Sequence, residues 1–391
     1  MKTRLLYTTI VLFALGQLVQ AQRYCGSALN LTELHQTDPA RYQRIMDLES
    51  QTQIRINGAN SIPDSIIIPV VVHVLYRNTS ENISNAQVAT QIQVLNEDFR
   101  RLNADSTNTP LLFRNAAGRA NIIFKLAAVD PNGNATSGIT RKATTVNGFS
   151  KPSNNMKFNA TGGQDAWDPY SYLNIWVCNF SDANLMGYAQ FPDELASRTN
   201  TDGVVISYKY FGRGGSTTAP YDKGRTTTHE VGHWLNLRHI WGDEKNCTAT
   251  DFVSDTPNQY EAMFGCPSYP ARDACTTVTP GIMFMNYMDY TADGCMNLFT
   301  KGQVDRMLPL FDTQTGVRKQ LLVNAKYLTG SSCVNNFANR TVTSNTSVGG
   351  CEINVWNVTV QNNAKLTLSA TGTTTIEDTF EVASGAQLEI N

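Results

Sequence analysis

The sequence carries few charges for its length, and the two signs nearly cancel. Asp, Glu, Lys and Arg make up 16% of the 391 residues, and the formal net charge is -2 at pH 7. A nucleic-acid-binding surface needs an excess of Lys and Arg, so this composition excludes nucleic acid as an expected partner. After residue 21 no apolar run is long enough to cross a bilayer, which predicts no membrane span in the mature chain.

Histidine is scarce, and its few copies are clustered. The chain has five, and three of them lie in residues 229–239, which read HEVGHWLNLRH. Positions i and i+4 share one face of a helix, so His229 and His233 can present two imidazoles to one metal ion, with Glu230 beside a water at that ion. If the chain turns back after the helix, His239 supplies a third ligand. Three protein ligands and one open position are typical of a catalytic zinc site.

Two other interpretations of these histidines are weaker. They could be core residues of an amphipathic helix, but burying a glutamate and two imidazoles there would cost free energy without gain. A distant glutamate could be the third ligand, as in another clan of zinc peptidases, but the presence of His239 argues against it.

The N-terminus reads as a secretory signal peptide over residues 1–21. Lys2 and Arg4 precede an apolar run from Leu5 to Leu18, and the small-residue pattern ending at Ala21 is typical of a cleavage site. A transmembrane anchor is the alternative, but the run is short and is interrupted by Thr and Gln. We therefore expect a secreted, extracellular protein.

The histidine stretch resembles the extended zinc signature of the metzincin metalloproteases. The sequence of this stretch, HEVGHWLNLRHIWGD, is most similar to the pappalysin family of cytophagalysin- and ulilysin-like proteases. Metzincins have Gly where this chain has Asn236, at a sharp turn after the helix. Asn tolerates a left-handed backbone best among the other residues, so we expect the turn to form. The resemblance covers residues 60–315 and implies one catalytic zinc ion.

The resemblance also implies the fold class, an α/β metzincin catalytic domain. Such a domain has a twisted mixed sheet, a backing helix, an active-site helix and an irregular, disulfide-bonded C-terminal subdomain. The apolar patterns agree with it, because Val88 to Leu102 show helical spacing after a possible Ser84 cap. Strands are predicted at Ile66–Tyr76, Ile122–Val129, Leu173–Val177 and Gly203–Ser207.

Residues 283–295 resemble the Met-turn of the metzincins. The resemblance makes Met288 the apolar base beneath the zinc imidazoles and Tyr290 a catalytic residue that stabilises the oxyanion. It places Asp293 at the base of the pocket for the side chain after the scissile bond, here called the specificity pocket. A carboxylate there favours Arg. From the residues alone, the methionines could be core and Asp293 a surface charge.

A short segment from Gly187 to Pro192 is predicted to be an edge strand. In metzincins such a strand pairs with the extended substrate, which assigns Gly187, Tyr188 and Ala189 to substrate binding by strand addition. An ordinary edge strand is an equal alternative. His73 lies in an apolar strand and is interpreted as a packed residue, not a ligand.

Eight cysteines in an exported chain imply disulfides. Four of them follow the zinc motif closely and allow three pairings, of which the resemblance favours the crossed one. The expected pairs are Cys247–Cys275, Cys266–Cys295 and, separately, Cys333–Cys351, with Cys178 a buried free thiol.

Residues 22–54 are polar, with a helix around Pro39 to Glu49, and are interpreted as a propeptide. Cys25 could occupy the fourth zinc position in a latent zymogen, since thiolate is an excellent zinc ligand. A disulfide to Cys178 or a spare thiol is the alternative. Cleavage before Arg55, in a stretch expected to be flexible, would release the propeptide.

Beyond the zinc motif, three acidic residues suit a calcium ion in an extracellular loop, although solvated turn acids are an equal alternative. They are Asp243, Asp251 and Asp255.

The chain is therefore divided into a signal peptide (1–21), a propeptide (22–54), a catalytic domain (55–330) and a β-rich, solenoid-like module (331–391). We expect a secreted zinc endopeptidase, made as a latent zymogen, that cuts protein or peptide substrates before Arg. The alternative is a non-catalytic, zinc-containing surface or adhesion protein. The joint presence of the ligands, base, Met-turn and tyrosine argues against it.

Overall fold

A computed structural model describes residues 24–58, 62–322, 326, 334–350, 352–370, 374–376 and 379–390. The predicted signal peptide and the predicted Cys333–Cys351 pair lie outside these residues.

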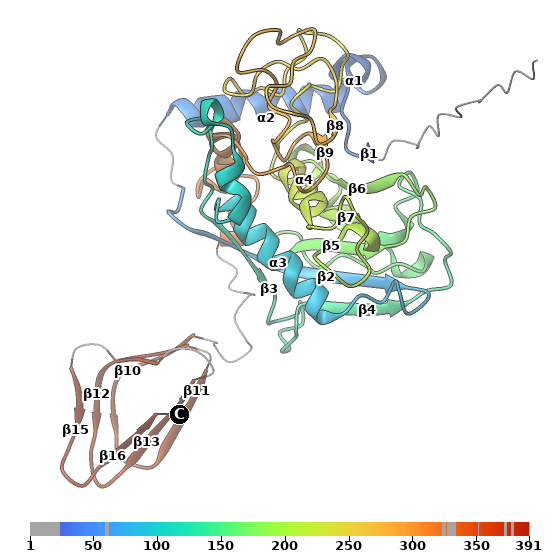
Figure 1. Ribbon diagram of the computed structural model, residues 1–391. Helices are drawn as coiled ribbons and strands as arrows, with labels where there is room; N and C mark the ends of the chain where they lie inside the picture. The colour runs from blue at the N-terminus through green and yellow to red at the C-terminus, as the bar shows by residue number, and fades with distance from the viewer. Residues whose placement is uncertain are drawn as a thin grey trace, which may run out of the picture.

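The predicted catalytic domain is organised around a seven-stranded mixed sheet (Figure 1). The strand order is β1-β6-β7-β5-β2-β3, with β4 pairing the second half of β2. Only the β6–β7 pair of this sheet is antiparallel among the described residues. The strands are β1 Tyr24–Cys25, β2 Ile66–Tyr76, β3 Ile122–Leu126, β4 Ile139–Ala143, β5 Leu173–Cys178, β6 Leu185–Ala189 and β7 Val204–Ser207.

The expected mixed α/β fold is confirmed, with two strands, β1 and β4, beyond the five that the sequence predicted. The sequence does not predict β4, because its residues, ITRKA, are only partly buried and show no alternation of apolar and polar side chains. By contrast β2 is buried along nearly its whole length, as its β-branched run predicted.

Helix α3, Asn85–Phe99, covers one face of the sheet and contacts both β3 and the active-site helix α4, Arg225–Trp234. The Ser84 hydroxyl accepts a hydrogen bond from the Gln87 N–H at 3.1 Å, which is the predicted N-cap. Val88, Leu95 and Phe99 join the apolar core of the sheet and α4.

Helices α1, Leu31–Thr37, and α2, Pro39–Asn57, lie in the predicted propeptide. The expectation that residues 51–55 are flexible is wrong, because α2 continues through them. Asp38 caps this helix through the Arg41 N–H, and Leu48 and Thr52 are buried, so packing extends the helix beyond the point where its apolar pattern fades. Arg55 lies in the last turn and donates to the Thr315 hydroxyl at 2.8 Å.

The remaining helices and strands of the predicted catalytic domain are short. Helix α5, Lys301–Met307, begins with a capping box between Thr300 and Gln303. β8, Phe264–Gly265, pairs with β9, Tyr290–Thr291. The 3-10 turns are Ala104–Asn108, Leu111–Phe113, Asn155–Lys157, Asn159–Thr161, Pro192–Glu194, Thr199–Thr201, Tyr208–Tyr210, Leu308–Phe311 and Lys319–Leu322.

The C-terminal strands form two parallel sheets around a core of their own. Paired residues lie 18 to 22 positions apart in the chain, as in a solenoid that returns beside itself once per coil. One sheet has the order β10-β12-β14 with β15 also on β12, and the other β11-β13-β16. The strands are Val334–Val342, Thr346–Gly350, Glu352–Val360, Lys365–Ala370, Thr374–Ile376, Phe380–Val382 and Gln387–Ile390.

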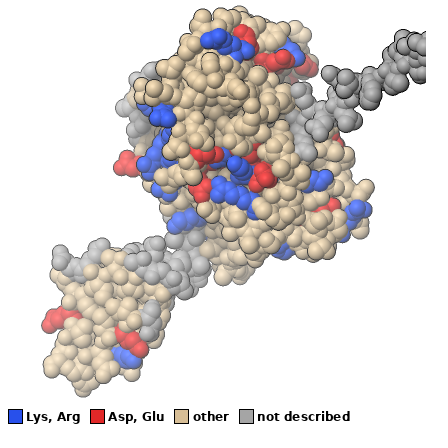
Figure 2. All heavy atoms as spheres, viewed as in Figure 1, with Lys and Arg blue, Asp and Glu red and all other residues tan. Residues whose placement is uncertain are grey.

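Two crossed disulfides, Cys247–Cys275 and Cys266–Cys295, hold the irregular region after α4, as the resemblance implied. Cys25 and Cys178 are buried free thiols. Helices long and apolar enough for a bilayer are absent from the described part of the chain. Figure 2 shows acidic and basic side chains mixed on the face in view, in line with the small net charge.

His73 is packed inside the sheet, between Thr140 of β4 at 2.8 Å and Asn174 of β5 at 3.0 Å. Burial lowers its pKa from 6.5 to about 4. The folded chain therefore keeps His73 neutral at pH values where the unfolded chain protonates it. This difference destabilises the fold as the pH falls below 6.5, by about 3 kcal/mol at pH 4.

Replacing His73 with Gln is therefore expected to flatten the decline in melting temperature between pH 6.5 and pH 4.5. The melts are made in a full chain that also carries Glu230→Ala, to prevent self-cleavage. His35→Gln, at an exposed position on α1, is the matched control and should keep the parental decline. An unchanged pH slope in His73→Gln would show that this histidine does not contribute to acid sensitivity.

Candidate metal centre and cleft

Helix α4 ends in the turn that the third histidine requires. Asn236 has a left-handed backbone with φ of 72°, as expected for the residue that stands in place of Gly. The Leu237 N–H donates to the Gly232 carbonyl at 2.9 Å, and Arg306 donates to the Asn236 carbonyl at 2.7 Å. This closed turn reverses the chain and returns His239 toward the helix.

The three predicted imidazoles converge on one point. The Nε2 atoms of His229, His233 and His239 are 3.1 Å apart in each of the three pairs. Two ligand atoms on a tetrahedral zinc ion lie about 3.3 Å apart, because each zinc–nitrogen bond is about 2.0–2.1 Å long. The spacing therefore suits one shared metal ion.

Hydrogen bonds behind the rings determine which nitrogens face inward. Nδ1 of His229 donates to the Tyr287 carbonyl at 2.7 Å, and Nδ1 of His233 donates to the Leu237 carbonyl at 2.8 Å. Nδ1 of His239 donates to the Asp243 carboxylate at 2.5 Å. Each ring in its neutral form then carries its proton on Nδ1, and three Nε2 lone pairs point at one another. Such an arrangement is unfavourable without a cation between them, so the residues fit a metal ion.

Burial keeps the imidazoles of His229 and His233 neutral. It lowers the pKa of His229 from 6.5 to about 3 and the pKa of His233 well below its usual range. A neutral imidazole is the form that binds a metal ion.

Cys25 reaches the same point from the predicted propeptide. Its Sγ and the three Nε2 atoms all lie within 4.8 Å of one another. Strand β1 carries it there by pairing in parallel with β6, and the Gly26 N–H donates to the Gly187 carbonyl at 2.8 Å. Burial raises the pKa of the Cys25 thiol well above its usual range, so a cation at the imidazoles is the group that would favour the thiolate.

Glu230 is fully buried beside Cys25. Its Oε2 atom lies 3.3 Å from Cys25 Sγ and accepts from the Ser27 hydroxyl at 3.1 Å, whereas its Oε1 atom is buried without a hydrogen-bond partner. Burial raises the pKa of this carboxyl to about 8. The predicted general base is therefore covered by the segment predicted to be a propeptide.

Tyr290 and Met288 lie where the Met-turn resemblance places them. The Tyr290 hydroxyl is 3.3 Å from the Cys25 carbonyl oxygen, which accepts its hydrogen bond, and its ring lies 5.7 Å from that of His229. Met288 is fully buried under α4. A Cβ atom added at Gly232, between the two helical histidines, would come within 2.6 Å of Met288 Sδ, so the sulfur lies directly against the helix.

The β6 edge presents its main chain to the cleft but not the tyrosine side chain. The Ala189 N–H donates to the Ser27 hydroxyl at 2.8 Å, and the Gly187 carbonyl is bound by Gly26. Tyr188 turns away, with its hydroxyl donating to Asn154 at 2.6 Å. Among the three β6 residues predicted to bind substrate, Tyr188 therefore presents backbone atoms to the cleft and not its side chain.

Asp293 lies in a pocket beside the imidazoles that Tyr221, Thr226 and Met296 also line. Its Oδ2 atom accepts from the main-chain N–H groups of Lys223, at 2.8 Å, and Arg225, at 3.2 Å. Burial raises the pKa of this carboxyl to about 6, so it is still ionised at neutral pH.

The three aspartates predicted to bind calcium have separate surroundings. Asp243 binds His239 and accepts from the Leu29 N–H at 2.8 Å. Asp251 accepts from Thr256 and Val253, and Asp255 accepts from the Gly302 N–H. Among described residues, the one close group of three or more His, Cys, Asp or Glu ligands is Cys25 with the three histidines. The calcium site stays a prediction.

Sequence reasoning missed two residues at this centre. Ser27 bonds to Glu230 and to the β6 backbone, and its only signal was its position two residues after Cys25. Asp243 orients His239, and its signal was the spacing of four residues after that histidine. The sequence predicts Asp243 only as a calcium ligand.

Comparisons with known proteins find similarity to metalloproteases. A family profile described as pregnancy-associated plasma protein-A, peptidase M43, matches residues 158–312. An extracellular metalloprotease of Arthroderma otae is 30% identical over 303 residues, which are 76% of this chain and 93% of that protein. A mutant promirolysin of Tannerella forsythia has 60% identity and a TM-score of 0.76, over 78% of this chain and 99% of that one. Mature mirolysin of the same organism, in complex with a cleaved peptide, has 62% identity and a TM-score of 0.67, over 68% of this chain and 99% of that one.

Proposed function

The chain belongs to the pappalysin family of metalloproteases, and from this membership we propose that it is a secreted zinc endopeptidase, made latent, that cleaves before Arg. One observation carries the proposal. Three imidazoles direct their Nε2 atoms at one point, and the buried carboxyl group of Glu230 lies 3.3 Å from the Cys25 sulfur that reaches the same point. The names of its extracellular relatives support secretion.

The proposed chemistry divides between the metal and the chain. A zinc ion held by His229, His233 and His239 would polarise the scissile carbonyl and make a water more acidic. Glu230 then accepts the proton of the attacking water and delivers it to the leaving amine. The Tyr290 hydroxyl donates a hydrogen bond to the oxyanion that forms on the carbonyl. The main chain of Gly187 and Ala189 holds the substrate in an extended conformation.

The specificity pocket supports a preference for Arg. Asp293 is buried at neutral pH as a carboxylate, and a guanidinium can pair with it through two parallel hydrogen bonds. An apolar side chain there would leave the carboxylate without a counter-charge, which disfavours such substrates.

Residues 24–54 support the proposal of latency. They bring Cys25 to the imidazoles, cover Glu230 and fill the β6 edge where a substrate strand would bind. The promirolysin match covers 78% of this chain and the mature match 68%. The difference, 78% minus 68%, is 10% of the 391 residues, or about 39, which is close to the length of the proposed propeptide. Because Arg55 lies in the last turn of α2, cleavage before it requires that turn to unwind.

A degenerate peptide library tests this function directly. We expect the activated enzyme to cut before Arg, and a zinc chelator to abolish every cut. Re-addition of zinc should restore activity. Chelator-sensitive cuts without an Arg preference would retain the metalloprotease and reject the role of Asp293. Cleavage that survives full removal of the metal would contradict the zinc mechanism.

A further inference from the structure

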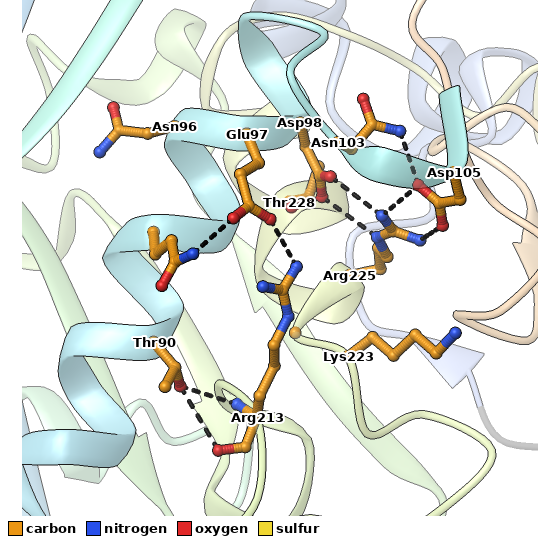
Figure 3. Close-up of polar contacts among 12 residues, drawn as sticks. Thr90, Asn96, Glu97, Asp98, Asn103, Asp105, Arg213, Lys223, Arg225 and Thr228 are labelled. Carbon is orange, nitrogen blue, oxygen red and sulfur yellow. Dashed lines mark hydrogen bonds and ion pairs between the residues drawn. The ribbon is translucent and has the colours of Figure 1, made fainter. Parts of the chain in front are cut away.

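Arg225, the first residue of α4, binds carboxylates on the α3 side (Figure 3) and connects them to the specificity pocket. Its guanidinium pairs with two carboxylates on the α3 side. Nε and Nη2 donate to Asp98 at 3.3 and 3.2 Å, and Nη1 and Nη2 donate to Asp105 at 2.7 and 3.0 Å. Only 2% of the side chain is exposed. Two forked ion pairs of this kind fix both the position and the plane of the guanidinium.

The same residue holds the segment that carries the pocket carboxylate. Nη1 donates to the main-chain carbonyls of Asp293, at 2.8 Å, and Met296, at 2.7 Å. The Arg225 main-chain N–H donates to the Asp293 carboxylate at 3.2 Å. Asp293 is thus held by Arg225 through both its main chain and its side chain.

We infer that Arg225 is a positioning residue that sets the Asp293 carboxylate for the arginine after the scissile bond, and so determines substrate selectivity. This inference rests on the proposed function. Arg225 acts through Asp293, since its own side chain is committed to Asp98, Asp105 and two carbonyls. A carboxylate displaced by a fraction of an ångström would lose the two-pronged pairing before it lost catalysis.

The choice of variant follows from the geometry. Arg225→Lys keeps the positive charge, but three donors on one nitrogen cannot bridge two carboxylates and two carbonyls. Asp105→Asn removes one charge at a position that is 22% exposed, where the fold tolerates change more readily. Asp98 is left intact, because it also binds Thr228 and the hydroxyl of Tyr287, whose carbonyl orients His229.

The chain offers a matched control. Arg213 forms an ion pair with Glu97 of α3 at 2.7 Å, one residue before Asp98 (Figure 3). It has no hydrogen bond to the Asp293–Met296 segment among those that the structure describes. Arg213→Lys should therefore weaken an ion pair on the same helix without moving Asp293.

The experiment measures kcat and KM on two peptides that differ only in the residue after the cleaved bond, Arg or Ala. For Arg225→Lys we expect the Arg-to-Ala ratio of kcat/KM to fall about tenfold or more, the factor associated with one lost charge-assisted hydrogen bond. The fall should come from KM of the Arg peptide, while the Ala peptide and the zinc content stay near parental values. Asp105→Asn should shift the ratio in the same direction by less, and Arg213→Lys should keep it.

An unchanged ratio in Arg225→Lys overturns the inference. An equal loss on both peptides also overturns it, because it assigns Arg225 to the fold and not to selectivity. A parental enzyme that cuts both peptides equally well rejects the Arg preference and this inference with it, while its chelator sensitivity still supports the metalloprotease.

Discussion

Glu230→Gln is expected to reduce kcat/KM by about 10³-fold or more while the metal and the fold are retained, since a positioned general base contributes about 10²–10⁴-fold and this one also returns the proton. The amide keeps the shape of the side chain but cannot accept a proton from water. Zinc should remain bound, because Glu230 is not one of the three proposed ligands. The Nδ1 atoms of those ligands are oriented by Tyr287, Leu237 and Asp243, and not by Glu230.

The measurement uses variant zymogen that a trace of parental enzyme has matured in trans, with the parent then removed by an affinity tag. Peptide turnover, zinc content and melting temperature are recorded together. Glu261→Gln is the control, because Glu261 is exposed and pairs only with exposed Lys245 among the described residues. If the Glu230 variant kept more than about a tenth of parental turnover, another group would have to accept the proton.

Cys25→Ser is expected to release the latent chain, with activity in the freshly purified zymogen rising about tenfold or more. A neutral hydroxyl is a far weaker zinc ligand than a thiolate, and a loss of about 1.4 kcal/mol already changes occupancy tenfold. The β1–β6 pairing and the Ser27 contact remain, so the segment should still bind but should leave the cleft more often.

Cys178→Ala is the matched control, because Cys178 is the other buried free cysteine of the described chain and lies in β5, away from the imidazoles. The Cys178→Ala variant should leave latency unchanged.

N-terminal sequencing of the matured product should give a chain that begins at Arg55. If the Cys25→Ser zymogen were as inactive as the parental zymogen, latency would come from the pairing of β1 with β6 and not from the thiol.

Local chemistry made the metal centre predictable from the sequence. Two histidines one turn apart, a neighbouring glutamate and a third histidine after a left-handed Asn236 are encoded within eleven consecutive residues. The crossed disulfides and the Met-turn came from the family resemblance. The continuous apolar run of β2 and the helical spacing of apolar residues in α3 predicted the layers of the fold.

Features that depend on tertiary packing were not predictable in the same way. Arg225 and Asp98 are 127 positions apart, and nothing in either local sequence shows that they meet. The length of α2 is set by burial of Leu48 and Thr52 against the catalytic body, which a polar sequence conceals. The sequence indicates only a loop acid at Asp243, because the contact of its carboxylate with His239 depends on the folded position of both residues.

The crossed disulfides keep the region after α4 in one covalently linked piece even after the chain has been cut there. A single peptide-bond cut anywhere between Cys247 and Cys295 leaves both pieces joined, because at least one bridge spans every such cut. Sequential pairing would leave residues 267–274 unspanned, and exposed Arg272 lies there, before which this enzyme is proposed to cut. A nick at that arginine would therefore leave the Met-turn covalently tied to the zinc helix, and one self-inflicted cut would not divide the protease into separate fragments.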